Sequence, residues 1–186
     1  MLNLNEIKIG KIIIVNNSPF IIIKTDHHKM GRGGAVLKVR LKNLINGSAL
    51  NKTFQGNDKA EEANIETKKI DYLYKDETSA NFMDNKTYEQ FSISLDQIGE
   101  KQKFLKEGTI VDVLYFNNNP VSINIPVKMD FKVISSPPGV KGNSTGNVTK
   151  QVKIETGALI NVPLFINEGD NIRVNTDTGE YVERIK

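Results

Sequence analysis

The chain has 186 residues, of which 38% are hydrophobic, 25% charged and 7% aromatic, a composition that predicts a folded protein with mostly aliphatic cores. It contains no cysteine, which excludes disulfides, thiolate metal sites and cysteine nucleophiles and favours a cytoplasmic location. The formal net charge is only +3, but residues 1–65 hold ten Lys and Arg against five Asp and Glu, so we expect one end of the molecule to face a polyanion such as nucleic acid.

The apolar segments are short, rich in β-branched residues and bounded by Gly, Asn, Asp or Pro, a pattern typical of an all-β fold. The longest apolar runs, such as Ile12–Val15, contain about four residues, so neither a membrane span nor a secretory leader is expected. Two apolar runs between residues 10 and 24 flank Asn16–Pro19, which predicts a turn between paired strands. From residue 35 to 42, apolar residues at odd positions alternate with the mostly cationic set Val36, Lys38, Arg40 and Lys42, so this strand should bury one face only.

Residues 55–64 are polar and do not alternate, which indicates a connection into a second barrel. A strand pattern resumes at Ile70–Tyr74, and a helix is predicted from Ser94 to Lys106, with Ser94 and Gln97 as its capping box and Gly108 after its end. Further strands are predicted over the ranges Thr109–Phe116, Val121–Ile125, Val152–Ile154, Ala158–Pro163 and Ile172–Asn175, and from about Met129.

These patterns predict three small β-barrels with domains at residues 1–65, 66–128 and 129–186. Barrels of about 60 residues have small cores, so we expect packing between neighbours to add stability. We expect a monomer.

The sequence offers little for catalysis or metal binding. Its acidic pairs lie in polar turns, and nothing marks a carboxylate as desolvated for acid–base work. Adjacent side chains of an extended segment point to opposite faces, so His27 and His28 are not expected to hold a metal together. The glycines at 31, 33 and 34 lack the spacing of known nucleotide-binding loops and precede a strand rather than a helix. No cofactor, metal or catalytic residue is therefore predicted.

The segment Asp26–Gly34 remains as a glycine-rich hairpin tip that carries Lys29 and Arg32. Glycines allow the backbone to approach a partner closely while the cations meet phosphate or ribose. A turn without further function is the alternative interpretation.

This tip resembles elongation factor P, whose first-domain loop reads Lys-Pro-Gly-(Lys/Arg)-Gly and precedes a strand ending in Lys-x-(Lys/Arg)-Asn-Leu. The corresponding residues here are Lys29, Met30, Gly31, Arg32, Gly33 and Gly34, followed by Leu41-Lys42-Asn43-Leu44. Residues 138–146, 156–158, 162–166 and 177–184 are similar to the family's third domain. The resemblance extends over essentially the whole chain.

The resemblance implies a KOW/SH3-like barrel followed by two OB-fold barrels, arranged in an L shape. It also implies a non-enzymatic factor that binds the 70S ribosome between the peptidyl and exit tRNA sites and promotes peptide-bond formation at polyproline stalls. Its tip loop would reach prolyl peptidyl-tRNA, with Lys38, Arg40 and Lys42 as a basic strand facing RNA. The loop Gly142, Asn143 and Ser144 would approach exit-site mRNA, and Tyr181 and Arg184 would contact tRNA or the ribosome.

Two positions depart from the family pattern. Met30 replaces the usual proline, which removes a rigid φ before the tip. Asn143 replaces the aspartate of the family's Gly-Asp-Thr, so the loop keeps hydrogen-bonding groups but loses a charge. Many relatives carry a modified tip residue; Arg32 excludes the lysine chemistry and leaves modification by an arginine-modifying enzyme, or function without modification.

Two alternatives share this architecture. One is the elongation-factor-P-like paralogue, but the tip residues favour elongation factor P itself. The other is a generic OB-fold protein that binds single-stranded nucleic acid, for which exposed aromatics among basic residues would be needed. Tyr72, Tyr74 and Tyr88 have mainly polar or acidic sequence neighbours.

Overall fold

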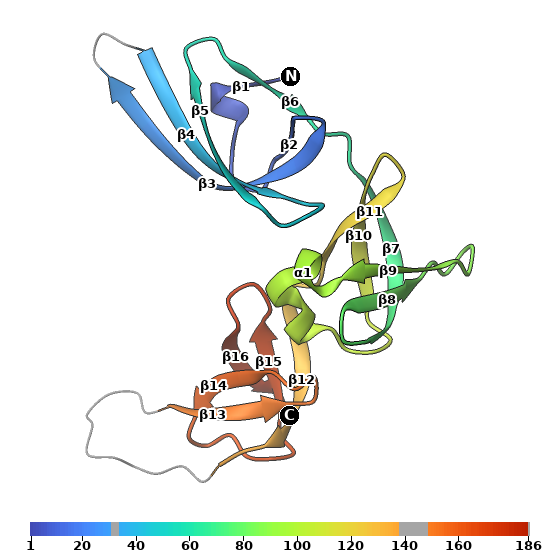
Figure 1. Ribbon diagram of the computed structural model, residues 1–186. Coiled ribbons are helices and arrows are strands. Elements are labelled where there is room, and N and C mark those ends of the chain that lie inside the picture. Colours follow the sequence, from blue (N-terminus) through green and yellow to red (C-terminus); the bar gives the residue numbers. More distant parts are fainter. Residues whose placement is uncertain (31–33, 138–148, 186) are drawn as a thin grey trace.

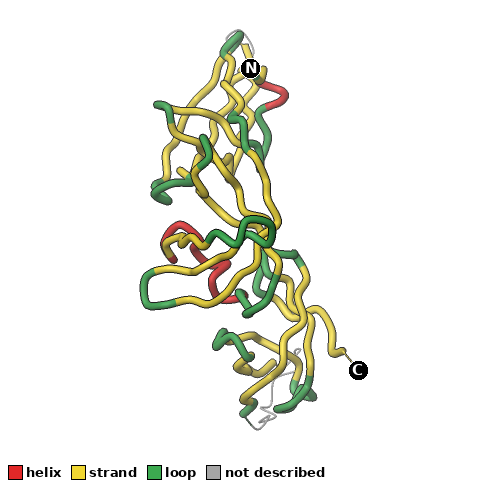
Figure 2. Tube along the Cα trace, turned by 90° about the vertical axis from the view of Figure 1, so that its right-hand side faces the viewer, coloured by secondary structure: helices red, strands yellow, loops and turns green. Residues whose placement is uncertain are grey.

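The computed structural model describes residues 1–30, 34–137 and 149–185. In these residues the chain forms three antiparallel sheets, one of six strands followed by two of five. The sheets follow one another in a bent row (Figure 1), and a perpendicular view shows the same succession (Figure 2). The prediction of an all-β fold is confirmed, while the domain boundaries near 65 and 128 stay predictions.

The first sheet has the strand order β1-β6-β2-β3-β4-β5. Its elements are β1 (Leu2–Asn3), a 3-10 helix (Leu4–Glu6), β2 (Ile12–Val15), β3 (Ser18–Met30), β4 (Gly34–Asn43), β5 (Ala49–Gln55) and β6 (Lys59–Glu62). The alternation predicted for β4 is present, since Leu37, Val39 and Leu41 are buried and Lys38 and Arg40 are exposed. One face of this sheet therefore covers a core, and the other is polar.

Strand β6 corrects the prediction that residues 55–64 form only a connection. It pairs with β1 and β2, and Ala60 is its one buried residue. Strand pairing is made by backbone groups, so a strand that contributes a single small apolar side chain leaves almost no alternation in the sequence.

The second sheet has the order β11-β10-β7-β8-β9. Its elements are β7 (Glu66–Lys75), β8 (Ser79–Met83), β9 (Gln90–Ser94), α1 (Leu95–Ile98), the 3-10 helix η2 (Gly99–Phe104), β10 (Ile110–Phe116) and β11 (Asn119–Asn124).

The predicted helix over Ser94–Lys106 is only partly correct. Ser94 does cap it, because its Oγ accepts a hydrogen bond from the Gln97 backbone N at 3.3 Å. The α-helix ends after four residues at Gly99, whose φ of +66° lies outside the helical region. The chain continues as the 3-10 helix η2, which ends at Phe104.

The third sheet repeats the topology of the second. Its elements are β12 (Lys128–Ser135), β13 (Thr149–Ile154), β14 (Leu159–Pro163), β15 (Asn171–Asn175) and β16 (Glu180–Ile185). In both sheets the first strand is central, with the second and third strands on one side and the fourth and fifth on the other. The two outer strands of each sheet also approach one another, which closes the sheet into a barrel.

Two hairpins are closed by paired asparagines, and the first of them lies where the sequence predicted a turn. Asn16 and Asn17 join β2 to β3, and Asn117 and Asn118 join β10 to β11, all four with positive φ. A two-residue hairpin turn with both φ values positive matches the twist of the strands, and asparagine tolerates this conformation.

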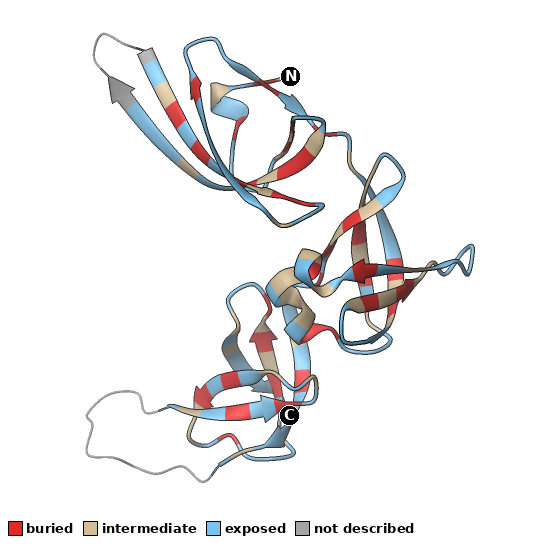
Figure 3. Ribbon diagram, viewed as in Figure 1, coloured by how far each residue is buried: buried red, intermediate tan, exposed pale blue. Residues whose placement is uncertain are grey.

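The buried apolar residues form three clusters (Figure 3). The first barrel has its own cluster, with Ile22 and Leu41 fully buried. The second and third barrels share one continuous cluster, in which Phe104 of η2 packs on Phe131 of β12. A small third cluster of Leu44, Leu114 and Val121 lies between the first and second barrels. The three barrels are thus connected by apolar contacts, but unequally.

Candidate nucleic-acid interface

The longest hairpin of the molecule, β3–β4, extends beyond the core of the first barrel. Its pairing continues from Phe20↔Asn43 to Met30↔Gly34. The inward side chains Ile22 and Leu41 are buried near its base, whereas Asp26, His27 and His28 are all exposed (Figure 3). The β3 side of this outer part is therefore exposed, whereas Leu37 of β4, directly opposite His27, is still buried in the core.

The predicted tip residues occupy the end of this hairpin. Lys29 and Met30 end β3, and Gly34 begins β4. Gly31, Arg32 and Gly33 lie outside the described residues.

The polar face of the hairpin contains more cations than the sequence prediction named. Lys38 and Arg40 are exposed on β4, and Lys24 on β3 lies directly opposite Arg40. The Lys24 Nζ lies 3.5 Å from the carboxylate of Asp26, which in turn is opposite Lys38. Residues directly opposite on paired strands share a face, so Lys24 of β3 lies on the same face as the predicted basic residues of β4. A bulge between Ile22 and Lys24 shifts the register, and this hid Lys24 from the sequence pattern.

Lys42 shares the polar face of β4 but lies in a different environment. It is half-buried, and a methyl group placed on Gly99 of the second barrel would lie 3.5 Å from its Nζ. Its ammonium group is therefore beside the helical segment of the second barrel, whereas Lys38 and Arg40 lie further out along the hairpin.

Lys101 of the second barrel is a further cation near the junction of the first and second barrels, and the sequence did not reveal it. Its Nζ donates hydrogen bonds to the Ile123 carbonyl at 2.9 Å and to Asn124 Oδ1 at 2.8 Å. Burial lowers the pKa of Lys101, Asp177 of the third barrel opposes this, and the charge of Lys42 adds to it. Charges of the first and third barrels thus act on this half-buried amine of the second barrel, whose hydrogen bonds connect η2 to β11.

The predicted residues of the third barrel lie on β16, where each has partners within the chain. Burial raises the pKa of Tyr181, whose ring packs against the shared core. Arg184 lies 3.7 Å from the Asp170 carboxylate and has its guanidinium over the Phe165 ring at 5.8 Å. Gly142, Asn143 and Ser144 lie outside the described residues.

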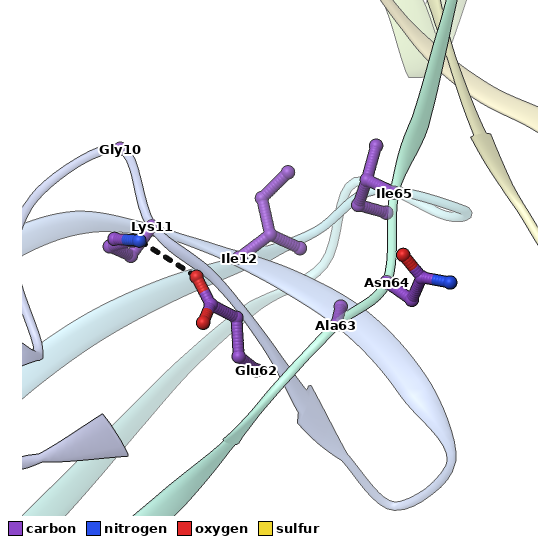
Figure 4. Close-up of a pocket in the computed structure, with 7 residues that line it drawn as sticks. All are labelled: Gly10, Lys11, Ile12, Glu62, Ala63, Asn64 and Ile65. Atoms are coloured by element: carbon purple, nitrogen blue, oxygen red, sulfur yellow. Dashed lines mark hydrogen bonds and ion pairs between the residues drawn. The ribbon is translucent and has the colours of Figure 1, made fainter. Parts of the chain in front are cut away.

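A cleft of about 550 Å³ lies where the first barrel ends, between residues 10–12 and 62–65 (Figure 4). Lys11 and Glu62 form an ion pair of 2.7 Å at one side, and Ile12 and Ile65 lie at the other. The bond to Glu62 raises the pKa of Lys11, and the bond to Lys11 lowers the pKa of Glu62. Both groups are stabilised in their charged forms, so neither is prepared for proton transfer.

The described part of the chain contains no group of three His, Asp or Glu side chains that could hold a metal ion. Among the helices of the described residues, none has the length and apolar character needed to cross a bilayer.

The fold and the charged hairpin define a chain of three small β-barrels with a cationic projection, an architecture suited to nucleic-acid contact. Family models match all three parts: the elongation factor P KOW-like domain at residues 3–60, its OB domain at 65–123, and its C-terminal domain at 129–184. The chain belongs to the elongation factor P family of translation factors.

Full-length relatives agree with this assignment. Elongation factor P of Coprothermobacter proteolyticus is 40% identical and covers 100% of both chains. That of Campylobacter lari is 40% identical over 97% of this chain and 96% of its own, and that of Endomicrobium trichonymphae is 41% identical over 99% and 100%. Among solved structures, a eukaryotic-type initiation factor 5A from Methanococcus jannaschii has a TM-score of 0.48 at 20% identity, covering 67% of this chain and 92% of its own.

Proposed function

We propose that this protein binds the 70S ribosome between the peptidyl and exit tRNA sites and promotes peptide-bond formation at polyproline stalls. The observation that carries the proposal is the long β3–β4 hairpin, whose polar face carries Lys24, Lys38 and Arg40. Membership of the elongation factor P family supports the ribosome as partner. A projecting, narrow, cationic element suits contact with tRNA in a confined space.

The mechanism we propose is positioning rather than chemistry. Proline is a poor and rigid reactant, and a peptidyl-tRNA that moves freely spends little time in a reactive arrangement. Holding its acceptor end lowers the entropic part of the barrier without any proton transfer by the factor. The Lys11–Glu62 pair that lines the cleft of the first barrel is stabilised in its charged form and so is not prepared for proton transfer.

The tip Lys29–Gly34 would make the contact with prolyl peptidyl-tRNA, with Arg32 as its central group. A guanidinium is a permanently charged, planar fork that can bind phosphate or ribose through two donors. The glycines on both sides add no bulk, and Met30 lacks the φ-fixing ring of the proline in the family pattern. Arg32 is also the residue that an arginine-modifying enzyme would act on.

The third barrel would set the depth of insertion. We propose that Gly142, Asn143 and Ser144 approach exit-site mRNA and that Tyr181 and Arg184 support the contact with tRNA or ribosome. Asn143 can still donate and accept hydrogen bonds there, although it lacks the charge of the family's aspartate.

The test is synthesis of a Pro-Pro-Pro peptide in a reconstituted translation system, with thermal melting measured alongside. Arg32→Ala should melt like the parent and lose most of the acceleration, because a charged contact to a buried partner is typically worth about 2–5 kcal/mol. Arg32→Lys should fall between the two, since it keeps the charge but not the fork.

A double variant that removes two positive charges from the polar face of the β3–β4 hairpin tests directly whether this face binds the ribosome. Lys38→Gln/Arg40→Gln should weaken ribosome binding and flatten its dependence on salt. Lys8→Gln/Lys59→Gln removes the same charge from exposed positions elsewhere in the first barrel and should have a much smaller effect. Equal losses in both double variants would show that total charge, not the hairpin face, controls binding.

A further inference from the structure

The second barrel has a cationic cleft that the proposed function does not use. It has a volume of about 520 Å³ and lies between the start of β7 and the loop that joins β8 to β9. The loop projects away from the neighbouring barrels (Figure 1). The lining residues are Thr67, Lys68, Lys69, Asp84, Lys86 and Thr87.

Positive charge dominates this cleft, because it is lined by three lysines and one acid. The Asp84 carboxylate accepts hydrogen bonds from the backbone N of Lys86 at 2.8 Å and of Thr87 at 3.4 Å, so it is engaged in holding the loop. Lys68 lies over the Tyr115 ring at 4.8 Å. Lys68, Lys69 and Lys86 make no ion pair within the described residues. Lys68 and Lys69 are consecutive on β7 and point to opposite faces, so the ammonium groups that can meet one anionic ligand are those of Lys68 and Lys86.

Tyr88, the residue after Thr87, is unusual in conformation and in exposure. Its φ is +60°, and its side chain is 73% exposed. A bulky residue with positive φ is a genuine outlier, and such outliers cluster at functional sites. The loop holds it there with a hydrogen bond from its backbone N to the Asp84 carbonyl at 2.8 Å. The loop that lines the cleft with Thr87 thus also carries an exposed aromatic ring at the next position.

We propose that this cleft and Tyr88 form a binding subsite for single-stranded RNA, in which the lysines pair with backbone phosphates and the tyrosine ring stacks on an unpaired base. The supporting strands are β8 and β9, the second and third of the OB domain, and this pair of strands is a common nucleic-acid face of OB-folds. Cations that follow the backbone together with an aromatic platform are the two parts that such recognition needs. The immediate sequence neighbours of Tyr88, Thr87 and Glu89, are polar or acidic, and it is the fold that places the loop carrying Tyr88 beside Lys68 and Lys69 of β7.

The experiment measures fluorescence anisotropy of labelled decauridylate with the full-length protein. Tyr88→Gly removes the ring, while glycine accepts a φ of +60° without strain, so the variant should remain folded and bind about tenfold more weakly. Tyr88→Phe should bind like the parent because it keeps the ring. Tyr74→Thr, which removes an exposed tyrosine from the same sheet, should have no effect.

The lysines have a separate readout. Lys68→Gln/Lys86→Gln should lower the slope of log affinity against log salt by about 1.4, the value for two phosphate contacts on a single strand. Lys8→Gln/Lys59→Gln is the control of equal charge. Crosslinks from a 4-thiouridine probe should fall on residues 84–89 by mass spectrometry.

These outcomes are independent of the proposed rescue activity, since no ribosome is present. The loss caused by Tyr88→Gly should also persist when Lys38 and Arg40 are replaced by Gln, because distant sites act additively. Parent-like binding by Tyr88→Gly, or an equal loss with Tyr74→Thr, would overturn the proposal. So would an affinity of the parent for decauridylate no higher than for inorganic polyphosphate of the same charge, because the cleft would then bind a polyanion without reading bases.

Discussion

The two joints between the three barrels differ in construction. The joint between the second and third barrels lies inside one continuous apolar cluster, where the rings of Phe104 and Phe131 are 6.0 Å apart. Polar contacts surround it, including a 2.6 Å hydrogen bond from Thr156 Oγ1 to the Lys103 carbonyl. At the joint between the first and second barrels, the described residues form a separate and smaller apolar cluster of Leu44, Leu114 and Val121, and the Lys42 ammonium group lies beside Gly99.

This difference shows which parts of the molecule should respond together. Two barrels that share a core lose stability together when that core is damaged, whereas a small interface leaves its two sides free to move and to unfold separately. We therefore expect the second and third barrels to act as one cooperative body, and the first barrel, which carries the hairpin, to adjust its direction. Such an adjustment would let the hairpin follow a tRNA while the rest of the factor stays bound.

The largest effect should come from Phe104→Ala. Truncation of a buried phenylalanine costs about 3–5 kcal/mol, and this ring is 5% exposed between two barrels. Urea unfolding followed by hydrogen exchange should show lost protection in both the second and the third barrel and none in the first. Phe165→Ala, at a ring that is 56% exposed, is the control. Loss confined to the second barrel would mean that the shared cluster does not couple the two.

Leu114→Ala should lower the free energy of unfolding by less than Phe104→Ala does, and it should affect different barrels. Leu114 points away from the core residue Val113 toward the first barrel and is buried there. The substitution should cost about 2 kcal/mol, the lower end for a buried leucine, and should widen the distribution of shapes in small-angle scattering. Protection in the third barrel should stay unchanged. Leu50→Ala, in an exposed position of the first barrel, should alter neither measurement.

The sequence predicted the class of fold and much of the first hairpin for clear physical reasons. Residues 35–42 alternate because β4 has one buried and one polar face, and the asparagine pairs mark two-residue turns. Strand β6 was missed because it buries only Ala60. Strands β5, β8 and β9 were also not predicted, and β5 buries only Phe54. Local pattern shows a strand only where side chains alternate.

The contacts between barrels could not be predicted from local pattern. Leu114 and Val113 are adjacent and both buried, which has no period-two explanation until the first barrel covers the outer face. The bulge that places Lys24 opposite Arg40, and the fold that places Lys86 and Thr87 beside Lys68, likewise depend on long-range pairing. The predicted tip and exit-site loop rest on resemblance to the family, and their roles stay predictions.

A hydrogen bond from one buried hydroxyl group holds the segment that leads into the third barrel. Thr176 is 4% exposed, and its Oγ1 donates a 2.8 Å hydrogen bond to the Pro126 carbonyl. Thr176→Val keeps the shape but leaves that carbonyl without the bond, so the free energy of unfolding should fall by about 1–2 kcal/mol. Urea unfolding measures it, with Thr149→Val at an exposed strand position as the control. An unchanged midpoint would show that water replaces the hydroxyl at no cost.

The smallest effect concerns Glu155, which links the third barrel to Lys106 of the second at 2.9 Å. Burial raises the pKa of Glu155, but hydrogen bonds from the Lys106 ammonium and the Lys132 backbone N outweigh it, so the net pKa lies below the usual 4.5. A carboxyl with a lowered pKa in the folded state stabilises the fold at pH values above its unfolded pKa, and this contribution disappears as the pH falls through the folded pKa. Glu155→Gln should therefore unfold at a lower urea concentration than the parent at pH 7, by less than about 1 kcal/mol because the pair is partly exposed. The difference should shrink below pH 4.5 and vanish at strongly acidic pH, whereas Glu168→Gln, in an exposed turn of the same barrel, should match the parent throughout. A difference that persists at acidic pH would show that packing of the side chain, rather than its charge, connects the two barrels at this point.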